Sequence, residues 1–318
     1  MSSSGPASRV SRGVNAVLRK AILAAATNGR VRSFVSRYGM RIGGARFVAG
    51  ERLDECLEVL AQLNARGLRA NTTLLGEDVR SADETRAVAD EFRTILDRIA
   101  ERELRVNLAV KLTHLGLLID EELAFENVAA IVDHAESLGN FVRIDMEQSN
   151  LVDATLRIYG RLRESGRDAV GCVLQSYLYR TPADLDALLP SRPNLRLVKG
   201  AYLEPAEIAY PQKRDVDAAY VRLLEQALLG GAYLAVATHD ERLIAHTIRF
   251  TEQHGIGRDR YEFQMLYGVR PQLQLDLARR GYNVLVATPY GPEWYPYLMR
   301  RLAERPANVL FVVRNMLK

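Results

Sequence analysis

The chain has 318 residues, of which 48% are hydrophobic and 26% are charged, the composition of an ordinary globular protein. Its length allows one (β/α)8 barrel, which needs about 250 residues, together with a terminal arm. Cys56 and Cys172 lie far apart, which excludes a disulfide framework, and no apolar run approaches the ~20 residues of a membrane span. We therefore expect a cytoplasmic protein from a reducing compartment.

Positive charge is concentrated at the start of the chain. The first 50 residues contain nine Lys and Arg and no acid, so the remainder of a chain with net charge +4 carries −5. We expect residues 1–49 to form a basic helical arm, with two short helices over 14–34 and a disordered start at 1–8. Solvation, packing on the barrel and peripheral contact with an anionic inner membrane remain alternatives for this arm. Nucleic acid binding is disfavoured because no aromatic residues stud the basic segment.

From residue 50 onward helix-like and strand-like segments alternate. Helices are predicted at 52–65, 82–101 and 121–138. Strands are predicted at 69–75, 105–113, 140–145, 170–176, 194–199, 232–237, 261–266 and 282–288. Eight such repeats over 50–318, without a G-x-G-x-x-G or Walker A motif, favour a closed α/β barrel over an open doubly wound sheet.

Polar side chains stand where six consecutive predicted strands end. They are Lys111, Asp145, Gln175, Arg196 with Lys199, Thr238 with His239, and Gln264. Each alone has an ordinary explanation, such as a helix cap or a solvated loop. Because the active site of a barrel lies at the carboxyl ends of its strands, we expect the six to converge there.

A second informative segment, residues 291–306, begins with Gly-Pro, has a helical pattern and ends at Pro306. It contains adjacent Arg300 and Arg301, and Glu304 shares a face with Arg300. A surface helix with an ion pair is one interpretation, and a guanidinium clamp on a carboxylate is the other. The histidines lack metal-ligand spacing and no nucleophile elbow occurs, so neither a metal site nor a hydrolase is predicted.

Seven strings in the chain together resemble the successive motifs of the proline dehydrogenase family. They are LAVKLTHLG, VRIDMEQS, VLQSYLYRT, LRLVKGAYLEP, VATHD, YEFQMLYGVR and YGPEWYPYLMRRLAERPAN, in the family's order over residues 50–315. The chain is most similar to the short, monofunctional bacterial members. The resemblance implies a distorted (β/α)8 TIM-type barrel whose last helix lies across the mouth.

The resemblance also implies roles for particular residues. Lys111, Arg300 and Arg301 would bind the substrate carboxylate, Tyr202 would pack against the substrate ring, and Glu77 would pair with a helix arginine as a gate. Asp145 and Arg196 would form the central catalytic pair. The cofactor FAD would be bound by Met146, Gln175, Arg196, Val198, Lys199, Gly200, Thr238, His239 and Glu304.

The implied reaction is the flavin-dependent oxidation of L-proline to 1-pyrroline-5-carboxylate. Electrons would pass to a quinone, and pyrroline-5-carboxylate dehydrogenase would be the pathway partner. Hydroxyproline or another cyclic imino acid is an alternative substrate, because Ala287 stands where the family usually has a tyrosine over the substrate ring. A barrel that binds flavin or an anion without turnover is a more remote alternative.

Overall fold

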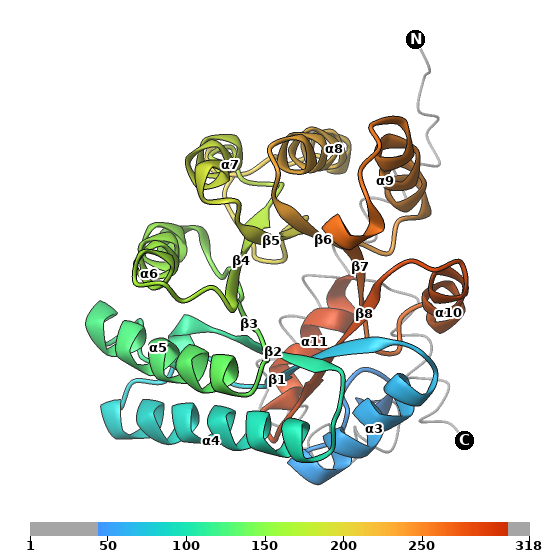
Figure 1. Cartoon of the computed structure of the whole chain (residues 1–318). Coiled ribbons are helices and arrows are strands. Elements are labelled where there is room, and N and C mark those ends of the chain that lie inside the picture. Colours follow the sequence, from blue (N-terminus) through green and yellow to red (C-terminus); the bar gives the residue numbers. More distant parts are fainter. Residues whose placement is uncertain (1–43, 305–318) are drawn as a thin grey trace.

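The computed structural model describes residues 44–304, with side chains up to Arg301 (Figure 1). The arm helices and disordered start that the sequence predicts, and the side chain of Glu304, lie outside the described residues. Among the described residues, no helix combines the length and the apolar character needed to span a membrane.

Eight parallel strands close into a barrel in the order in which they occur along the chain, which confirms the predicted fold class. Arg69 to Leu74 of the first strand pair with Leu285 to Tyr290 of the last and so close the sheet. The strands are β1 (Arg69–Leu74), β2 (Val106–Val110), β3 (Val142–Ile144), β4 (Val170–Gln175), β5 (Asn194–Val198), β6 (Tyr233–Ala237), β7 (Tyr261–Leu266) and β8 (Val284–Tyr290).

Helices surround the barrel and cover its outer face (Figure 1). They are α3 (Leu53–Ala65), α4 (Ala82–Glu101), α5 (Glu121–Ser137), α6 (Val152–Glu164), α7 (Thr181–Leu188), α8 (Lys213–Leu229), α9 (Glu241–Gln253) and α10 (Pro271–Arg279). A further helix, α11 (Trp294–Glu304), follows the last strand. Short 3-10 turns are η1 (Gly44–Arg46), η2 (Leu112–His114), η3 (Ser149–Leu151), η4 (Leu189–Ser191) and η5 (Arg258–Arg260). Side-chain caps begin several of the helices, as at Asp120, which accepts a hydrogen bond from the Leu123 amide at 3.0 Å.

The apolar core lies between the strands and this ring of helices. It takes alternate strand residues, such as Leu195 and Leu197 of β5, together with the inner faces of the helices. The other strand residues face the barrel interior, where branched apolar side chains usually dominate. Here that interior is polar. Its buried side chains include Asn71, Arg143, Arg196, Glu262 and Gln264.

The last helix, α11, does not join the outer ring, and in Figure 1 it crosses behind the barrel. Trp294, Tyr295 and Leu298 of α11 pack with Phe47 and Val48 in a separate apolar cluster. The Trp294 indole N–H also donates to the Glu51 carboxylate at 2.7 Å. These contacts hold α11 against the segment that precedes α3.

One predicted strand ends earlier than expected. The sequence pattern extends β2 to Thr113, but the strand stops at Val110 and the turn η2 follows. The Thr113 backbone N–H donates to the carboxylate of Glu147 at 3.1 Å instead of continuing the strand ladder. A buried side chain thus decides where the strand ends.

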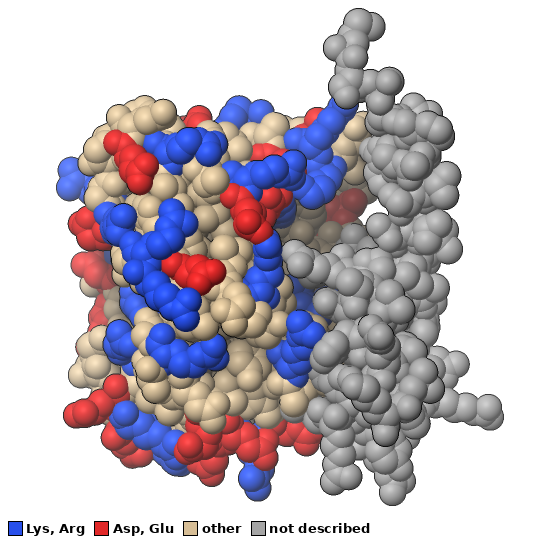
Figure 2. Space-filling view, turned by 90° about the vertical axis from the view of Figure 1, so that its right-hand side faces the viewer, with Lys and Arg blue, Asp and Glu red and all other residues tan. Residues whose placement is uncertain are grey.

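Charge is mixed on the flank that Figure 2 shows, where basic side chains lie among acidic ones. Ion pairs on α9 and α10 include Arg242 with Asp240 at 3.1 Å and Arg279 with Asp276 at 3.0 Å. Such exposed pairs contribute little to stability. By sequence, the first 50 residues contain nine Lys and Arg and no acid, whereas the remainder of the chain carries a net charge of −5.

Candidate active site

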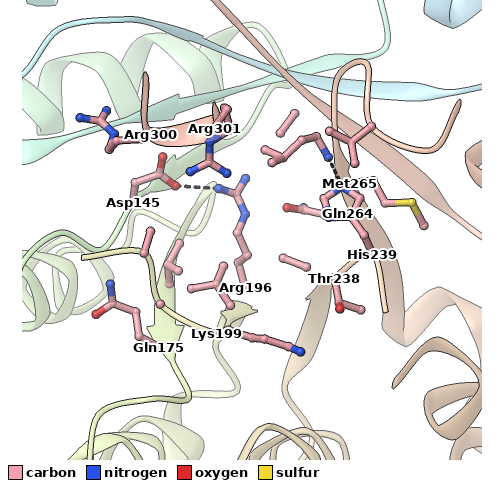
Figure 3. Close-up of a pocket in the computed structure, with 18 of the residues that line it drawn as sticks. Asp145, Gln175, Arg196, Lys199, Thr238, His239, Gln264, Met265, Arg300 and Arg301 are labelled. Carbon is pink, nitrogen blue, oxygen red and sulfur yellow. Dashed lines mark hydrogen bonds and ion pairs between the residues drawn. The ribbon is translucent and has the colours of Figure 1, made fainter. Parts of the chain in front are cut away.

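A cavity of about 780 Å³ opens at the carboxyl ends of the strands, beneath α11. All of the polar strand-end residues singled out in the sequence line it: Lys111, Asp145, Gln175, Arg196, Lys199, Thr238, His239 and Gln264. The predicted convergence is confirmed. Arg300 and Arg301 of α11 complete the cavity from above, as Figure 3 shows. The volume is that of a site for a small molecule or a cofactor.

Arg196 occupies the middle of the cavity wall, and Asp145 fixes its guanidinium (Figure 3). The two side chains form an ion pair with 2.6 Å between Nη1 and Oδ1. Asn71 accepts a second, longer bond from Arg196 Nη2 at 3.3 Å. Asn71 was missed by the sequence reasoning, although a polar residue inside an apolar strand was a usable signal. The three groups hold one cation at a fixed orientation inside the barrel.

At one corner of the cavity, two cations that line it bind the same acid. Glu77 Oε1 accepts a hydrogen bond from Lys111 Nζ at 3.0 Å, and Arg300 binds the same oxygen. Burial alone would raise the pKa of Glu77, but Lys111 and Arg300 outweigh it and hold that pKa below its usual value. The pairing of Glu77 with a helix arginine, expected from the family resemblance, is present. An anionic ligand would meet Lys111 and Arg300 already bound to a carboxylate.

The opposite side of the cavity is built by β4 to β7. Gln175 donates from its amide to the Glu147 carbonyl at 3.1 Å, while its buried Oε1 has no hydrogen-bond partner. Ring nitrogen Nε2 of His239 accepts from the Leu266 amide at 2.9 Å, which places any proton of the neutral ring on Nδ1. Thr238 accepts from the Asp240 amide at 3.1 Å. Each of these three side chains is thus held in one orientation by a hydrogen bond to the main chain.

The chain after β5 lines the same side with its backbone. Gly200 has φ of +116°, and a Cβ there would come within 2.2 Å of the Tyr177 ring. Lys199 pairs with Asp217 at 2.5 Å, and Val198 and Met146 also line the cavity. A flat, hydrogen-bonding ring system fits this wall, because it offers apolar contacts, a closely packed backbone and the free acceptor of Gln175.

Tyr202 lies in the loop between β5 and α8 and lines the cavity. Burial and the neighbouring acids raise the pKa of its hydroxyl, so the side chain is a neutral phenol. The loop is attached to the rest of the barrel by Glu204, which accepts bonds from the Ser149 amide at 2.8 Å and hydroxyl at 2.6 Å. Tyr202 is thereby held over the cavity.

Glu147 is a second residue that sequence reasoning missed. Its carboxylate is 1% exposed and accepts bonds from the backbone N–H and the hydroxyl of Thr113, at 3.1 and 2.6 Å. Burial raises its pKa to about 7. The only signal was its position, two residues after Asp145. Among the described residues no cluster of three or more His, Cys, Asp and Glu could hold a metal ion.

Comparison with known proteins identifies the kind of barrel. The family model described as proline dehydrogenase matches residues 56–314. The chain belongs to the proline dehydrogenase family. It is 42% identical to proline dehydrogenase 1 of Bacillus subtilis over 95% of this chain and 100% of that protein. It is 43% identical to the proline dehydrogenase of Deinococcus radiodurans over 96% of this chain and 99% of that protein. The family is generally flavin-dependent.

A solved structure shares the fold. Proline utilization A from Bdellovibrio bacteriovorus, inactivated by N-propargylglycine, superposes with a TM-score of 0.79 at 23% identity. The match covers 92% of this chain and 37% of that chain, so this chain spans little more than a third of that protein. At this identity the likeness supports the barrel fold alone.

Proposed function

We propose that the chain oxidises L-proline to 1-pyrroline-5-carboxylate with FAD as its cofactor. Membership of the proline dehydrogenase family supports the reaction. The observation that carries the proposal is the cavity itself, where a cationic corner faces a wall of fixed hydrogen-bonding groups with Arg196 between them. A small zwitterion and a flat cofactor can lie there side by side.

The cationic corner binds the substrate through its carboxylate. Lys111, Arg300 and Arg301 line one end of the cavity, and guanidinium groups bind carboxylates through two parallel hydrogen bonds. Glu77 forms ion pairs with two of these cations, Lys111 and Arg300. Substrate binding would therefore replace the Glu77 carboxylate with that of the substrate. Tyr202 covers the apolar ring. Fixing the acid end in this way determines which ring carbon faces the cofactor.

The opposite wall binds the cofactor. Gln175, Lys199, Thr238 and His239 supply polar contacts, while Met146, Val198 and Gly200 supply apolar contact and close backbone approach. Glu304 is proposed to take part, although its side chain lies outside the described residues. The chemistry that FAD would supply at this wall is acceptance of a hydride from the ring carbon next to the substrate nitrogen. Arg196, held by Asp145, places a positive charge that favours the reduced cofactor.

The substrate nitrogen must be uncharged when the C–H bond breaks, because its lone pair forms the new C=N bond. Lys111, Arg300 and Arg301 disfavour a further positive charge beside them and so lower the pKa of the substrate amine. A quinone would then take the electrons, and pyrroline-5-carboxylate dehydrogenase would take the cyclic imine. A pH profile of flavin reduction that shows no ionisation of the substrate nitrogen would contradict this step.

A second candidate substrate is 4-hydroxyproline. Ala287 of β8 lines the cavity, and its register partner on β1 is Asn71. The Asn71 side chain accepts a hydrogen bond from Arg196. A small side chain there leaves room for a ring that carries a hydroxyl group. Ala287→Tyr is expected to raise kcat/KM for proline relative to 4-hydroxyproline, whereas an unchanged ratio would exclude this role of Ala287.

Absorbance spectra of the purified protein test the proposal. We expect flavin bands that bleach when L-proline is added without oxygen. A colourless protein that takes up no added FAD would overturn the proposal. A yellow protein that proline and hydroxyproline leave unbleached would instead support a barrel that binds flavin without turnover.

A further inference from the structure

Glu147 lies behind the wall of the cavity, at a junction of three strand ends. It follows Asp145 by two residues in the loop after β3, and its side chain is almost fully buried. The residues around it that line the cavity are Lys111 from the end of β2, Met146 in its own loop and Gln175 at the end of β4. A carboxyl group buried in this place needs hydrogen-bond partners that compensate for its lost hydration.

The side chain of Glu147 binds the neighbouring strand end. Both of its oxygens bond to Thr113, one to the backbone N–H at 3.1 Å and one to the hydroxyl at 2.6 Å. Thr113 lies in the turn η2, two residues after Lys111, and Lys111 is the N-cap residue directly before this turn. Two bonds to one residue fix both the position and the rotation of the turn. The direction in which Lys111 leaves the backbone is fixed with it.

The main chain of Glu147 binds the strand end on the other side. Its carbonyl accepts the Gln175 amide at 3.1 Å, and the Met146 carbonyl lies 3.5 Å from the same nitrogen. Because the amide nitrogen is directed to these carbonyls, Oε1 of Gln175 remains as the buried oxygen without a hydrogen-bond partner. Asp145 and Gln175 lie on the same side of the cavity in Figure 3.

We propose that Glu147 is a positioning residue with two outputs, one for the substrate and one for the cofactor. Its carboxylate aligns Lys111 with the substrate carboxylate by holding Thr113. Its carbonyl oxygen sets the amide of Gln175 so that the amide oxygen accepts a hydrogen bond from the flavin. The proposal rests on the proposed function, because it assigns Lys111 to the substrate and Gln175 to the cofactor.

A double-mutant cycle between Glu147 and Lys111 tests the first output. Glu147→Ala is expected to lower kcat/KM for proline at least about tenfold, mainly through KM, because both hydrogen bonds that hold Thr113 are lost. Lys111→Ala should do so more strongly. If Glu147 acts through Lys111, adding Glu147→Ala to Lys111→Ala should change KM less than about twofold.

The outcomes of this cycle separate the two proposals. Independent, additive effects of Glu147→Ala and Lys111→Ala would overturn the positioning role while leaving the proposed function intact. An unchanged KM in Lys111→Ala would instead overturn the substrate site itself. Glu147→Gln should retain KM within about threefold, since an amide can accept the Thr113 N–H and donate to the Thr113 hydroxyl. Failure of this rescue would also count against the positioning role.

Thr113→Val provides the test if Glu147→Ala does not fold. It removes the hydroxyl without changing the shape, and KM is expected to rise about threefold to tenfold with flavin content unchanged. Thr247→Val is the matched control, because the Thr247 hydroxyl is also buried and donates to a backbone carbonyl, that of Leu243, and neither residue lines the cavity. Equal effects of the two substitutions on KM would contradict the proposal.

Gln175→Glu tests the second output. The substitution retains the shape but replaces the donor that faces the Glu147 carbonyl with an oxygen. The dissociation constant of FAD is expected to rise about tenfold, while Glu147→Ala leaves it within about twofold because the carbonyl remains. Unchanged FAD affinity in Gln175→Glu would overturn the cofactor output.

Discussion

Arg143 and Arg196 both extend into the barrel, from β3 and β5, and both are almost fully buried, at 2% and 7% exposed. Their surroundings differ. Arg143 donates to the Asn194 carbonyl at 2.7 Å and to the Cys172 carbonyl at 3.0 Å, and its second terminal nitrogen binds the Asn194 side chain. Arg196 is held by Asp145 and Asn71 and lines the cavity.

The comparison separates a structural cation from a functional one. The guanidinium of Arg143 is used to hold β3, β4 and β5 together, and burial lowers its pKa to about 10, so it remains charged at neutral pH. Arg196 is oriented by its ion pair with Asp145, and one side of its guanidinium faces the cavity. The same residue type therefore stabilises the barrel in one layer and meets ligands in the next.

The largest expected effect is on catalysis at the mouth. Arg196→Met should lower kcat about 100- to 1000-fold, because a preorganised charge beside the reacting groups is lost. The free energy of unfolding should change little, since Asp145 remains partly hydrated. Steady-state kinetics and urea denaturation measure the two quantities. A larger loss of activity in Arg143→Ala than in Arg196→Met would reverse the assignment of the two arginines.

Arg143→Ala should act on stability. It leaves buried oxygen atoms of Asn194 without their donors and removes a large packed side chain, for a cost of about 2–4 kcal/mol in the free energy of unfolding. Folded protein should retain kcat within about threefold. Urea denaturation of Arg143→Ala and of wild type measures this change in the free energy of unfolding. A stability equal to that of wild type would show that Arg143 does not hold the strands.

Gly171→Ala should affect the same layer less strongly. A Cβ at Gly171 would lie 2.4 Å from Arg143 Nη1 and from the Asn194 carbonyl oxygen, and one of these atoms belongs to the backbone. We expect a loss near the upper end of the 1–3 kcal/mol that is typical of overpacking, about 2–3 kcal/mol. Gly160→Ala in α6 is the matched control, because a Cβ there meets no atom within 4 Å.

The smallest expected effect concerns the pH dependence of stability at the mouth. The pKa of Glu147 is about 7 when folded and near 4.5 when unfolded, so the unfolded chain loses this proton first as pH rises. Protonated Glu147 therefore contributes fully to the free energy of unfolding below pH 4.5, and this contribution is lost as pH rises through 7. The loss between pH 5 and 7 is about 2 kcal/mol. The free energy of unfolding is measured against pH for wild type and for Glu147→Gln, and the difference between the two curves gives the contribution of Glu147. If this difference did not change between pH 5 and 7, Glu147 would not titrate in that range.

Sequence patterns predicted the strands closely because buried parallel strands are short apolar runs between turns. They also predicted the polar strand ends, because a charged residue at the end of such a run is conspicuous. Glu147 and Asn71 were missed for physical reasons. Their roles depend on partners 34 and 125 residues away in the chain, Thr113 and Arg196, and local patterns do not contain such pairings.

The order of βα repeats, the basic character of the first 50 residues and the polar strand ends follow from the sequence alone, since each depends on residues that are neighbours in the chain. The family resemblance had implied that the last helix lies over the mouth and that Glu77 pairs with a helix arginine. Only the tertiary structure decided that Glu77 binds Lys111 and Arg300 together and that Arg143 and Arg196 differ in use. The reason is closure of the barrel. It places β1 beside β8 and fixes which side chains share a layer, and hydrogen bonding and burial then act across that layer.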